Sequence, residues 1–265
     1  MDFLRSLKKN KELIWFLAKD DIKKRYAGSS LGVLWAFAQP CVTIIIYWFV
    51  FQIGLRSVAP GQYTNMPFLV WIMCGLIPWF FFSDGINSVT SVFLEYSYLV
   101  KKVLFNIDIL PFAKVISVLL VQLVLIVFTI ILFAIGGYWP DLHYLQIPIY
   151  LLYMILLATG VSYFTATLYV FFKDTMQIVA IVLQIFFWMT PIVWDIRIMP
   201  EIARKVLIFN PVYYIINGYR KIFIYKNGMG INKMMNLYYW GIVILFLIVG
   251  VCLFRKCKNH FADVL

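Results

Sequence analysis

Charged residues are scarce in this chain. Only 13% of its 265 residues are Asp, Glu, Lys or Arg, whereas 63% are hydrophobic and 19% are aromatic. A soluble domain is about 45–50% apolar and about 25% charged. A water-soluble fold of this size cannot hide so much apolar surface, and the composition excludes that class. The sequence therefore predicts an integral membrane protein that has the lipid bilayer as its solvent.

Residues suited to metal binding or covalent chemistry are few. The four cysteines form no CxxC pair, and the two histidines, His143 and His260, are far apart in the sequence. This pattern predicts no disulfide framework and no metal site. The chain also has no GxxxxGK[ST] loop, no HExxH and no GxSxG. We therefore expect no catalytic residue and no cofactor bound by this chain, and ATP binding through such a loop is excluded.

The net charge of +11 is compatible with nucleic-acid binding, but the positions of the basic residues favour another explanation. Lys and Arg cluster in the connections between long apolar runs, where they set membrane topology and attract anionic lipid. We expect membrane lipids, and no nucleic acid, as partners.

Long runs without charge predict six transmembrane helices, all α, in a single membrane domain that covers residues 1–265. The spans are expected at residues 31–53, 67–89, 115–136, 148–172, 175–194 and 234–254. Each run can cross about 30 Å at about 1.5 Å per helical residue. Lys and Arg concentrate before the first span, between the second and third, and after the last. Both termini are therefore expected in the cytoplasm.

The connection between the fifth and sixth spans departs from this charge rule, because it is predicted outside yet is rich in Lys and Arg. A seventh span at 207–225 would contain Asn210-Pro211 and Arg220, which are unfavourable at the bilayer centre. We therefore expect two short helices within residues 196–225. They would be broken at Asn210-Pro211 and would fold back into the outer leaflet or line a cavity.

An amphipathic helix is expected over residues 1–25, because apolar residues such as Ile14 and Leu17 share one helical face while lysines occupy the other. Such a pattern is typical of a helix that lies on the membrane interface.

Residues 95–110 form a second amphipathic segment on the cytoplasmic side. Tyr96, Leu99 and Val103 can share a face beside Lys101 and Lys102. The pattern fits a short helix that docks another protein, and it also fits a simple linker.

Two further features stay open on the residues alone. Asp84 lies near the cytoplasmic end of the second span, where it is either a solvated or lysine-paired residue or the ion-coupling group of a carrier. The aromatic residues of the spans either face lipid or line a path for sugar rings, which stack on aromatic faces.

Four stretches, in order along nearly the whole chain, carry a family resemblance. They are DDIKKRYAGSSLGVLWAFAQP at Asp20–Pro40, LVKKVLFNIDILP at Leu99–Pro111, FFKDTMQIVAIVLQIFFWMTPIVW at Phe171–Trp194, and NPVYYIINGYRKIF at Asn210–Phe223 with the terminal FADVL. Together they resemble the membrane subunits of ATP-binding-cassette exporters of cell-surface polysaccharides, the O-antigen, capsule and teichoic acid export permeases. Two positions depart from the family pattern: Asn106 stands where proline is usual, and Lys173 replaces the common arginine.

The resemblance implies a homodimer that pairs with two copies of a separate ATPase, which would hold the ATP and Mg²⁺. It implies a bacterial cytoplasmic membrane and an undecaprenyl-pyrophosphate-type lipid carrying a glycan as substrate. In this interpretation residues 1–25 are an interfacial helix, residues 95–106 a coupling helix that contacts the ATPase, and residues 196–225 two outer gate helices.

Four groups of candidate site residues follow. The residues expected to contact the ATPase are Glu95, Tyr96, Tyr98, Leu99, Lys101, Lys102 and Phe105. Arginine binds phosphate in a bidentate manner, and the candidate pyrophosphate contacts are Arg25, Arg56, Arg204 and Arg220. The candidate channel aromatics are Trp35, Tyr47, Phe186, Phe187, Trp188 and Tyr214. The candidate outer-gate residues are Asn210, Pro211, Tyr213 and Tyr219.

Two other classes of protein remain as alternatives. A secondary flippase or carrier would need no ATPase and would use Asp84 as its coupling group. A membrane-embedded glycosyl or acyl transferase would require catalytic residues that the sequence does not show.

Overall fold

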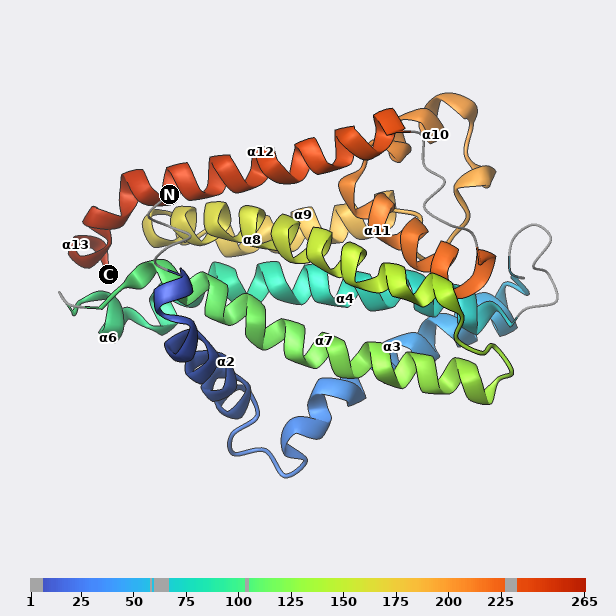
Figure 1. The fold of residues 1–265 in the computed structure, drawn as a ribbon, viewed down its shortest axis with the longest axis horizontal. Coiled ribbons are helices and arrows are strands. Elements are labelled where there is room, and N and C mark those ends of the chain that lie inside the picture. Colours follow the sequence, from blue (N-terminus) through green and yellow to red (C-terminus); the bar gives the residue numbers. More distant parts are fainter. Residues whose placement is uncertain (1–6, 58, 60–66, 103–104, 227–232) are drawn as a thin grey trace.

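The computed structural model describes residues 7–57, 59, 67–102, 105–226 and 233–265, and within these ranges every regular element is helical (Figure 1). The predicted all-α class is thus confirmed. The long helices are α3 (Trp35–Trp48, extended to Gly54 by the π-helix η2), α4 (Phe68–Thr90), α7 (Leu110–Ile135), α8 (Ile147–Phe171), α9 (Thr175–Met189) and α12 (Lys233–Cys257). The shorter ones are α2 (Lys11–Arg25), α5 (Val92–Glu95), α6 (Ser97–Val100), α10 (Glu201–Ile208), α11 (Pro211–Arg220) and α13 (Phe261–Val264).

Among the described residues, five helical stretches are long and apolar enough to cross a membrane. They are Gly32–Gly54, Phe68–Thr90, Ile107–Ile135, Leu142–Phe171 and Lys233–Val264. The predicted fifth span, residues 175–194, is shorter than expected, because α9 ends at Met189 after 15 residues. Thr190 precedes Pro191, which disfavours helical backbone, and Thr190 is extended at φ −93° and ψ 133°. A span needs about 20 helical residues. Helix α9 is shorter than this, so in the described residues helix length supports five of the six predicted spans.

The third span also differs from its predicted start at residue 115. Helix α7 begins at Leu110, follows the 3-10 turn η4 (Ile107–Ile109), and includes Lys114 in its first two turns. The charged side chain of Lys114 is accommodated within the helix because it is paired with carboxylates of neighbouring elements.

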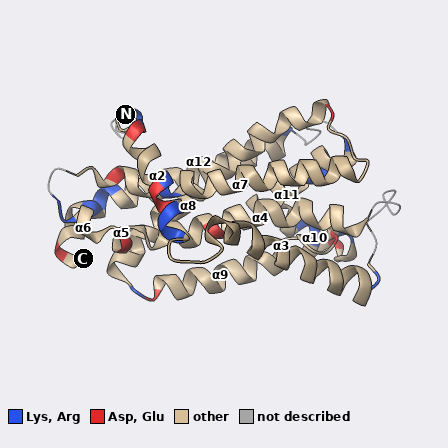
Figure 2. Ribbon diagram, turned by 90° about the horizontal axis from the view of Figure 1, so that it is seen from below, with Lys and Arg blue, Asp and Glu red and all other residues tan. Residues whose placement is uncertain are grey.

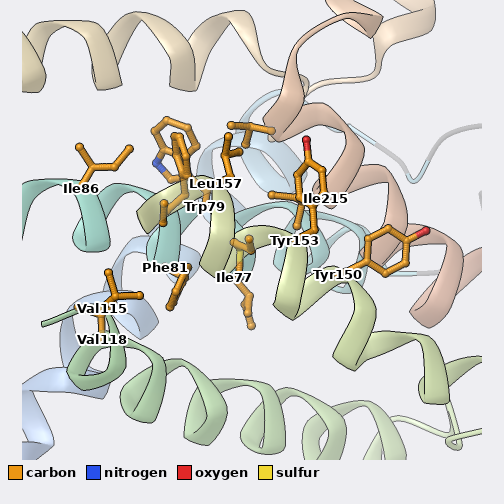
Figure 3. Packing of buried hydrophobic residues seen from close by; sticks show 14 of the residues in the cluster. Ile77, Trp79, Phe81, Ile86, Val115, Val118, Tyr150, Tyr153, Leu157 and Ile215 are labelled. Carbon is orange, nitrogen blue, oxygen red and sulfur yellow. The ribbon is translucent and has the colours of Figure 1, made fainter. Parts of the chain in front are cut away.

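Helix α4 forms the centre of the bundle. It contacts α3, α7, α8, α9 and α11, and 78% of its span window is buried, compared with 11% for the span that contains α3. Figure 3 shows side chains of α4 packed between α8 and α7: Ile77, Trp79, Phe81 and Ile86 lie among Leu157, Tyr153, Val115 and Val118. The aromatic and β-branched side chains of α4 therefore form the core against which the other spans are arranged.

The two ends of the bundle differ in composition from its middle. Charged residues gather around α2 and α6 and at the opposite end near α10, and the ribbon between them is almost free of charge (Figure 2). Helices α6 and α13 lie together at one end, and α10 lies at the other (Figure 1).

The segment expected as one coupling helix over residues 95–106 is divided. Helices α5 and α6 are four residues each and are separated by Tyr96, and the described residues after Val100 are non-helical up to Ile107. Residues 103 and 104 lie outside the described residues. Tyr96 and Val100 are buried, at 6% exposure each. The segment therefore packs these side chains against the bundle and does not form one continuous amphipathic helix.

Candidate functional site

Three cavities follow one another along α4, the first beside α2 and the other two beside α3, and we call them together the groove. The first, of about 470 Å³, lies beside Lys24, Arg25, Asp84, Glu95 and Lys114. The second, of about 370 Å³, shares Arg25 and Asp84 with the first. The third, of about 340 Å³, shares Thr43, Phe80 and Ser83 with the second and reaches α9. The groove thus runs from an ionic end to an aromatic wall.

Polar side chains line the groove at helical spacing. Gln39 and Thr43 are four residues apart on α3, and Ser83 and Asn87 are four residues apart on α4. Residues at this spacing share one face of a helix. Gln122 of α7 also lines the second cavity and donates to the Ile77 carbonyl at 3.1 Å. Uncharged polar groups of this kind inside apolar helices provide hydrogen-bonding groups for a polar solute.

Four of the six predicted channel aromatics line the groove. Trp35 lies at the second cavity, and Tyr47, Phe187 and Trp188 line the third. The Tyr47 and Phe187 rings are 5.6 Å apart, and Trp79 of α4 lies 5.5 Å from Phe187. These rings join α3, α4 and α9 in one aromatic wall.

The other two candidate aromatics lie elsewhere. Phe186 is half-buried and packs against the core without lining the groove. Tyr214 is 1% exposed, stacks on Tyr239 at 4.6 Å and donates to Asn236 at 2.9 Å. In this conformation Tyr214 belongs to the packing of α11 against α12.

The ionic end of the groove contains Arg25 and Asp84. Arg25 Nη1 lies 2.7 Å from Asp84 Oδ2, and Nη2 donates to the Ser88 hydroxyl at 3.1 Å. Burial lowers the pKa of Arg25, the Asp84 carboxylate raises it, and the net direction is upward. Asp84 is therefore a cation-paired residue here, with arginine as its partner.

Lys114 lies at the centre of a second ionic cluster. Its ammonium is 2.5 Å from Asp21 of α2 and 2.7 Å from Glu95 of α5, and the Ser117 hydroxyl donates to Asp21 at 2.6 Å. Lys114 and Asp21 are buried, at 7% and 4% exposure. The cluster joins the N-terminal helix, the segment predicted to couple, and α7.

The residues predicted to contact an ATPase fall into two sets. Tyr98, Lys101 and Lys102 are exposed, whereas Tyr96 is buried. Glu95 is exposed but binds Lys114 and the Ser91 hydroxyl, and Leu99 and Phe105 are half-buried against the core. Asn106, where the family pattern has proline, caps η4 by accepting from the Asp108 amide at 3.1 Å.

The remaining candidate arginines have different surroundings. Arg56 is exposed and has a left-handed backbone at φ 51°, and Arg204 is half-buried on α10. Arg220 is 5% exposed, and its two described hydrogen bonds go to the carbonyls of Pro191 and Ile192. A phosphate contact by Arg220 stays a prediction that this conformation does not favour.

The predicted break at Asn210-Pro211 separates α10 from α11. Asn210 caps α11 by accepting from the Val212 amide at 2.9 Å, and Pro211 occupies the first helical turn. Tyr213 is half-buried, and Tyr219 is 1% exposed and packs against Phe223.

Sequence reasoning missed Lys114, Asp21 and the polar groove residues Gln39, Thr43 and Asn87. A signal for the last group was present, because polar residues recur at a spacing of four within apolar runs. The pairing of Lys114 had no local signal, since Asp21 lies 93 residues away.

The chain matches the family model of ABC-2 type transporters over residues 12–224. It therefore belongs to the ABC-2 type transporter family, and the predicted resemblance is confirmed. Together with the apolar helices, the family defines a membrane protein with several spans.

Relatives match along nearly their whole length. An O-antigen export system permease protein RfbA of Klebsiella pneumoniae is 29% identical over 96% of this chain and 95% of the relative. A protein of the same name from Myxococcus xanthus is 27% identical over 98% of both chains. The polysialic acid transport protein KpsM of Escherichia coli is 22% identical over 89% of both.

Proposed function

We propose that this chain is the membrane subunit of an ATP-driven exporter that moves a lipid-linked cell-surface polysaccharide across the bacterial cytoplasmic membrane. The observation that carries the proposal is the full-length likeness to relatives named as O-antigen export permeases. ATP and Mg²⁺ would be bound by a separate ATPase subunit, with two copies of each subunit in the complex.

The groove supports a glycan as the transported part. Trp35, Tyr47, Phe187 and Trp188 present aromatic faces along it, and sugar rings stack on such faces through their apolar C–H surfaces. Side chains such as Gln39 can exchange hydrogen bonds with hydroxyl groups as the chain slides. The lipid pyrophosphate would lie outside the aromatic wall, near Arg25 on the inner side and near Arg56 or Arg204 on the outer side.

The uncovered face of α3 supports assembly with a second copy. Only 11% of its span window is buried inside one chain, the lowest value of the five spans in the described part of the structure. Because α3 also forms one side of the groove, a second copy on this face would close the groove into a channel.

The end with α6 and α13 would face the cytoplasm. Tyr98, Lys101 and Lys102 protrude from it and provide a basic, aromatic surface for an ATPase. Glu95 links this surface to α7 and α2 through Lys114, so that movement of α6 would be transmitted to the spans.

The decisive experiment is a pull-down of the tagged full chain from its native membranes, with mass spectrometry of the partners and an ATPase assay. We expect a phosphate-loop subunit in equal amount and vanadate-sensitive hydrolysis. A chain that elutes alone, without hydrolysis, would favour the carrier alternative. The variant Asp84→Asn would then be the next test, although the Arg25 ion pair already explains Asp84 without ion coupling.

Charge reversal of the basic pair that directly follows α6 tests the coupling surface. The double variant Lys101→Glu/Lys102→Glu should reduce ATPase co-purification by about tenfold, because it replaces both cations of the proposed contact by anions and removes the charge complementarity we assign to it. The matched control is Arg204→Glu/Lys205→Glu on α10, at the opposite end. Equal co-purification with both double variants would argue against the assignment.

A further inference from the structure

Residues at both ends of α11 form hydrogen bonds to the same short segment of the chain. At its N-terminus, Asn210 Nδ2 donates to the Thr190 hydroxyl at 2.7 Å. At its C-terminus, Arg220 Nη1 donates to the Pro191 carbonyl at 2.8 Å and Nη2 donates to the Ile192 carbonyl at 2.7 Å. The segment is the non-helical stretch that follows α9.

The need for these bonds arises from the sequence of the segment. Because Pro191 ends the helix, the chain passes through the bundle interior without regular structure. Thr190 and Ile192 are both 0% exposed, so their backbone groups have no access to water. Irregular backbone at membrane depth is tolerated only where protein groups satisfy it.

The guanidinium of Arg220 matches this requirement. Its two terminal nitrogens form a rigid planar fork, and each donates to one of two successive carbonyls. Its central carbon lies 3.6 Å from the ring centroid of Trp71 on α4. The side chain is therefore held between α4 and the segment after α9.

Gly75 of α4 makes room for the contact. A Cβ at this position would lie 2.6 Å from the Ile192 carbonyl oxygen and 3.3 Å from Arg220 Nη2. Any larger residue would push the segment or the guanidinium away from α4.

We propose that Arg220 is a positioning residue which, with Asn210, latches α11 to the segment after α9, so that α9 and α11 move together. Helix α9 contributes Leu183, Gln184, Phe187 and Trp188 to the groove. The latch thus fixes one wall of the groove at the end near α10. In this role Arg220 contacts backbone instead of a pyrophosphate. The consequence for transport rests on the proposed function, whereas the latch itself does not.

A natural cysteine reports on the latch. Cys74 is 1% exposed next to Gly75, whereas Cys252 is exposed on α12 and serves as an internal control. The experiment measures the rate at which N-ethylmaleimide labels each cysteine of the full chain in detergent, by peptide mass spectrometry. The variants are Arg220→Met, Arg220→Lys and Gly75→Ala. The controls are Arg204→Met and Gly85→Ala, whose added Cβ would make only an ordinary contact at 3.9 Å.

We expect Cys74 labelling to be at least about tenfold faster in Arg220→Met, since two charge-assisted hydrogen bonds are lost, and intermediate in Arg220→Lys. Gly75→Ala should also accelerate labelling although Arg220 is intact, and both controls should match the wild type. Unchanged Cys74 labelling in Arg220→Met and Gly75→Ala would overturn the latch. If Arg220→Met does not accumulate in membranes, Arg220→Lys and Gly75→Ala carry the test.

Export per membrane-inserted chain is the second measurement. Arg220→Met and Gly75→Ala should both lower export while ATPase co-purification stays normal. A phosphate contact predicts instead that Gly75→Ala and Gly85→Ala behave alike. Faster labelling with normal export would refute the positioning role. A chain without an ATPase partner would refute the proposed function and leave the labelling result unaffected.

Discussion

Lys114 and Arg220 are two buried cations with opposite kinds of partner. Lys114, at 7% exposure, is held by the carboxylates of Asp21 and Glu95. Arg220, at 5% exposure, is held by two backbone carbonyls and an aromatic ring. The first cation joins intact helices near the α6 end, and the second stabilises broken backbone near the α11 end.

The difference shows what each end of the bundle requires. Where α2, α5 and α7 converge, buried charges must be neutralised by opposite charges. Where α9 ends inside the bundle, the unsatisfied groups are neutral carbonyls, and a forked donor is sufficient. Removal of Lys114 therefore leaves the buried Asp21 carboxylate with only Arg25, at 3.6 Å, as a counter-ion, whereas removal of Arg220 leaves only neutral acceptors.

The largest effect is expected for Lys114→Met. Removing one partner of a buried ion pair costs about 3–5 kcal/mol, because the remaining charge is uncompensated. Because Arg25 still lies 3.6 Å from Asp21, we expect a loss at the lower end of this range, about 3 kcal/mol. The loss is measured as the free energy of unfolding of the full chain by SDS titration in mixed micelles.

Two variants provide the controls for this prediction. Adding Asp21→Asn to Lys114→Met should restore part of the stability, because the double variant also removes the buried carboxylate that has lost Lys114. Lys101→Met, at an exposed position, should cost almost nothing. A Lys114→Met protein as stable as Lys101→Met would show that the ion cluster does not stabilise this end.

A smaller effect is expected for Arg220→Met. The unsatisfied carbonyls cost about 1–3 kcal/mol, and the methionine side chain retains apolar contact with Trp71. The same SDS titration should therefore rank the losses as Lys114→Met above Arg220→Met. The reverse order would mean that the contacts of Arg220 to the non-helical segment contribute more to the free energy of unfolding than the Lys114 ion cluster does.

The sequence predicts these two regions to different extents. Charge-free runs locate α4, α8 and α12 closely, and Asn210-Pro211 marks the break before α11 correctly. Pro191 was visible too, but the hydrophobicity of Ile192 and Val193 extended the predicted span past it. The prediction followed the hydrophobic composition of this stretch and neglected the restriction that Pro191 places on the backbone of Thr190, which ends α9.

Contacts between residues distant in the sequence could not be predicted, for a physical reason. The rotation of each helix about its axis decides which residues face the groove, and one sequence does not fix that rotation. For the same reason we predicted Tyr214 at the channel, whereas it packs against α12. We also did not predict that Gln39 and Thr43 line the groove. The Lys114 cluster depends on three helices that meet only after folding.

The smallest effect is expected at the C-terminal contact, where Lys258 lies 2.8 Å from Asp108. The Lys258 side chain is 32% exposed and that of Asp108 is 11% exposed. Because water reaches the ammonium, we expect the pair to contribute little more than the about 0–1 kcal/mol of an exposed pair. Lys258→Met should therefore lower the free energy of unfolding by less than Arg220→Met does. The difference from wild type should disappear at about 1 M salt, where screening acts within about 3 Å. Lys256→Met, at an exposed position, is the control. A loss that persists in high salt would show that this contact behaves as a buried pair, like that of Lys114. The C-terminal end would then be held to the bundle by more than the packing of Phe261 against Phe93 of α5.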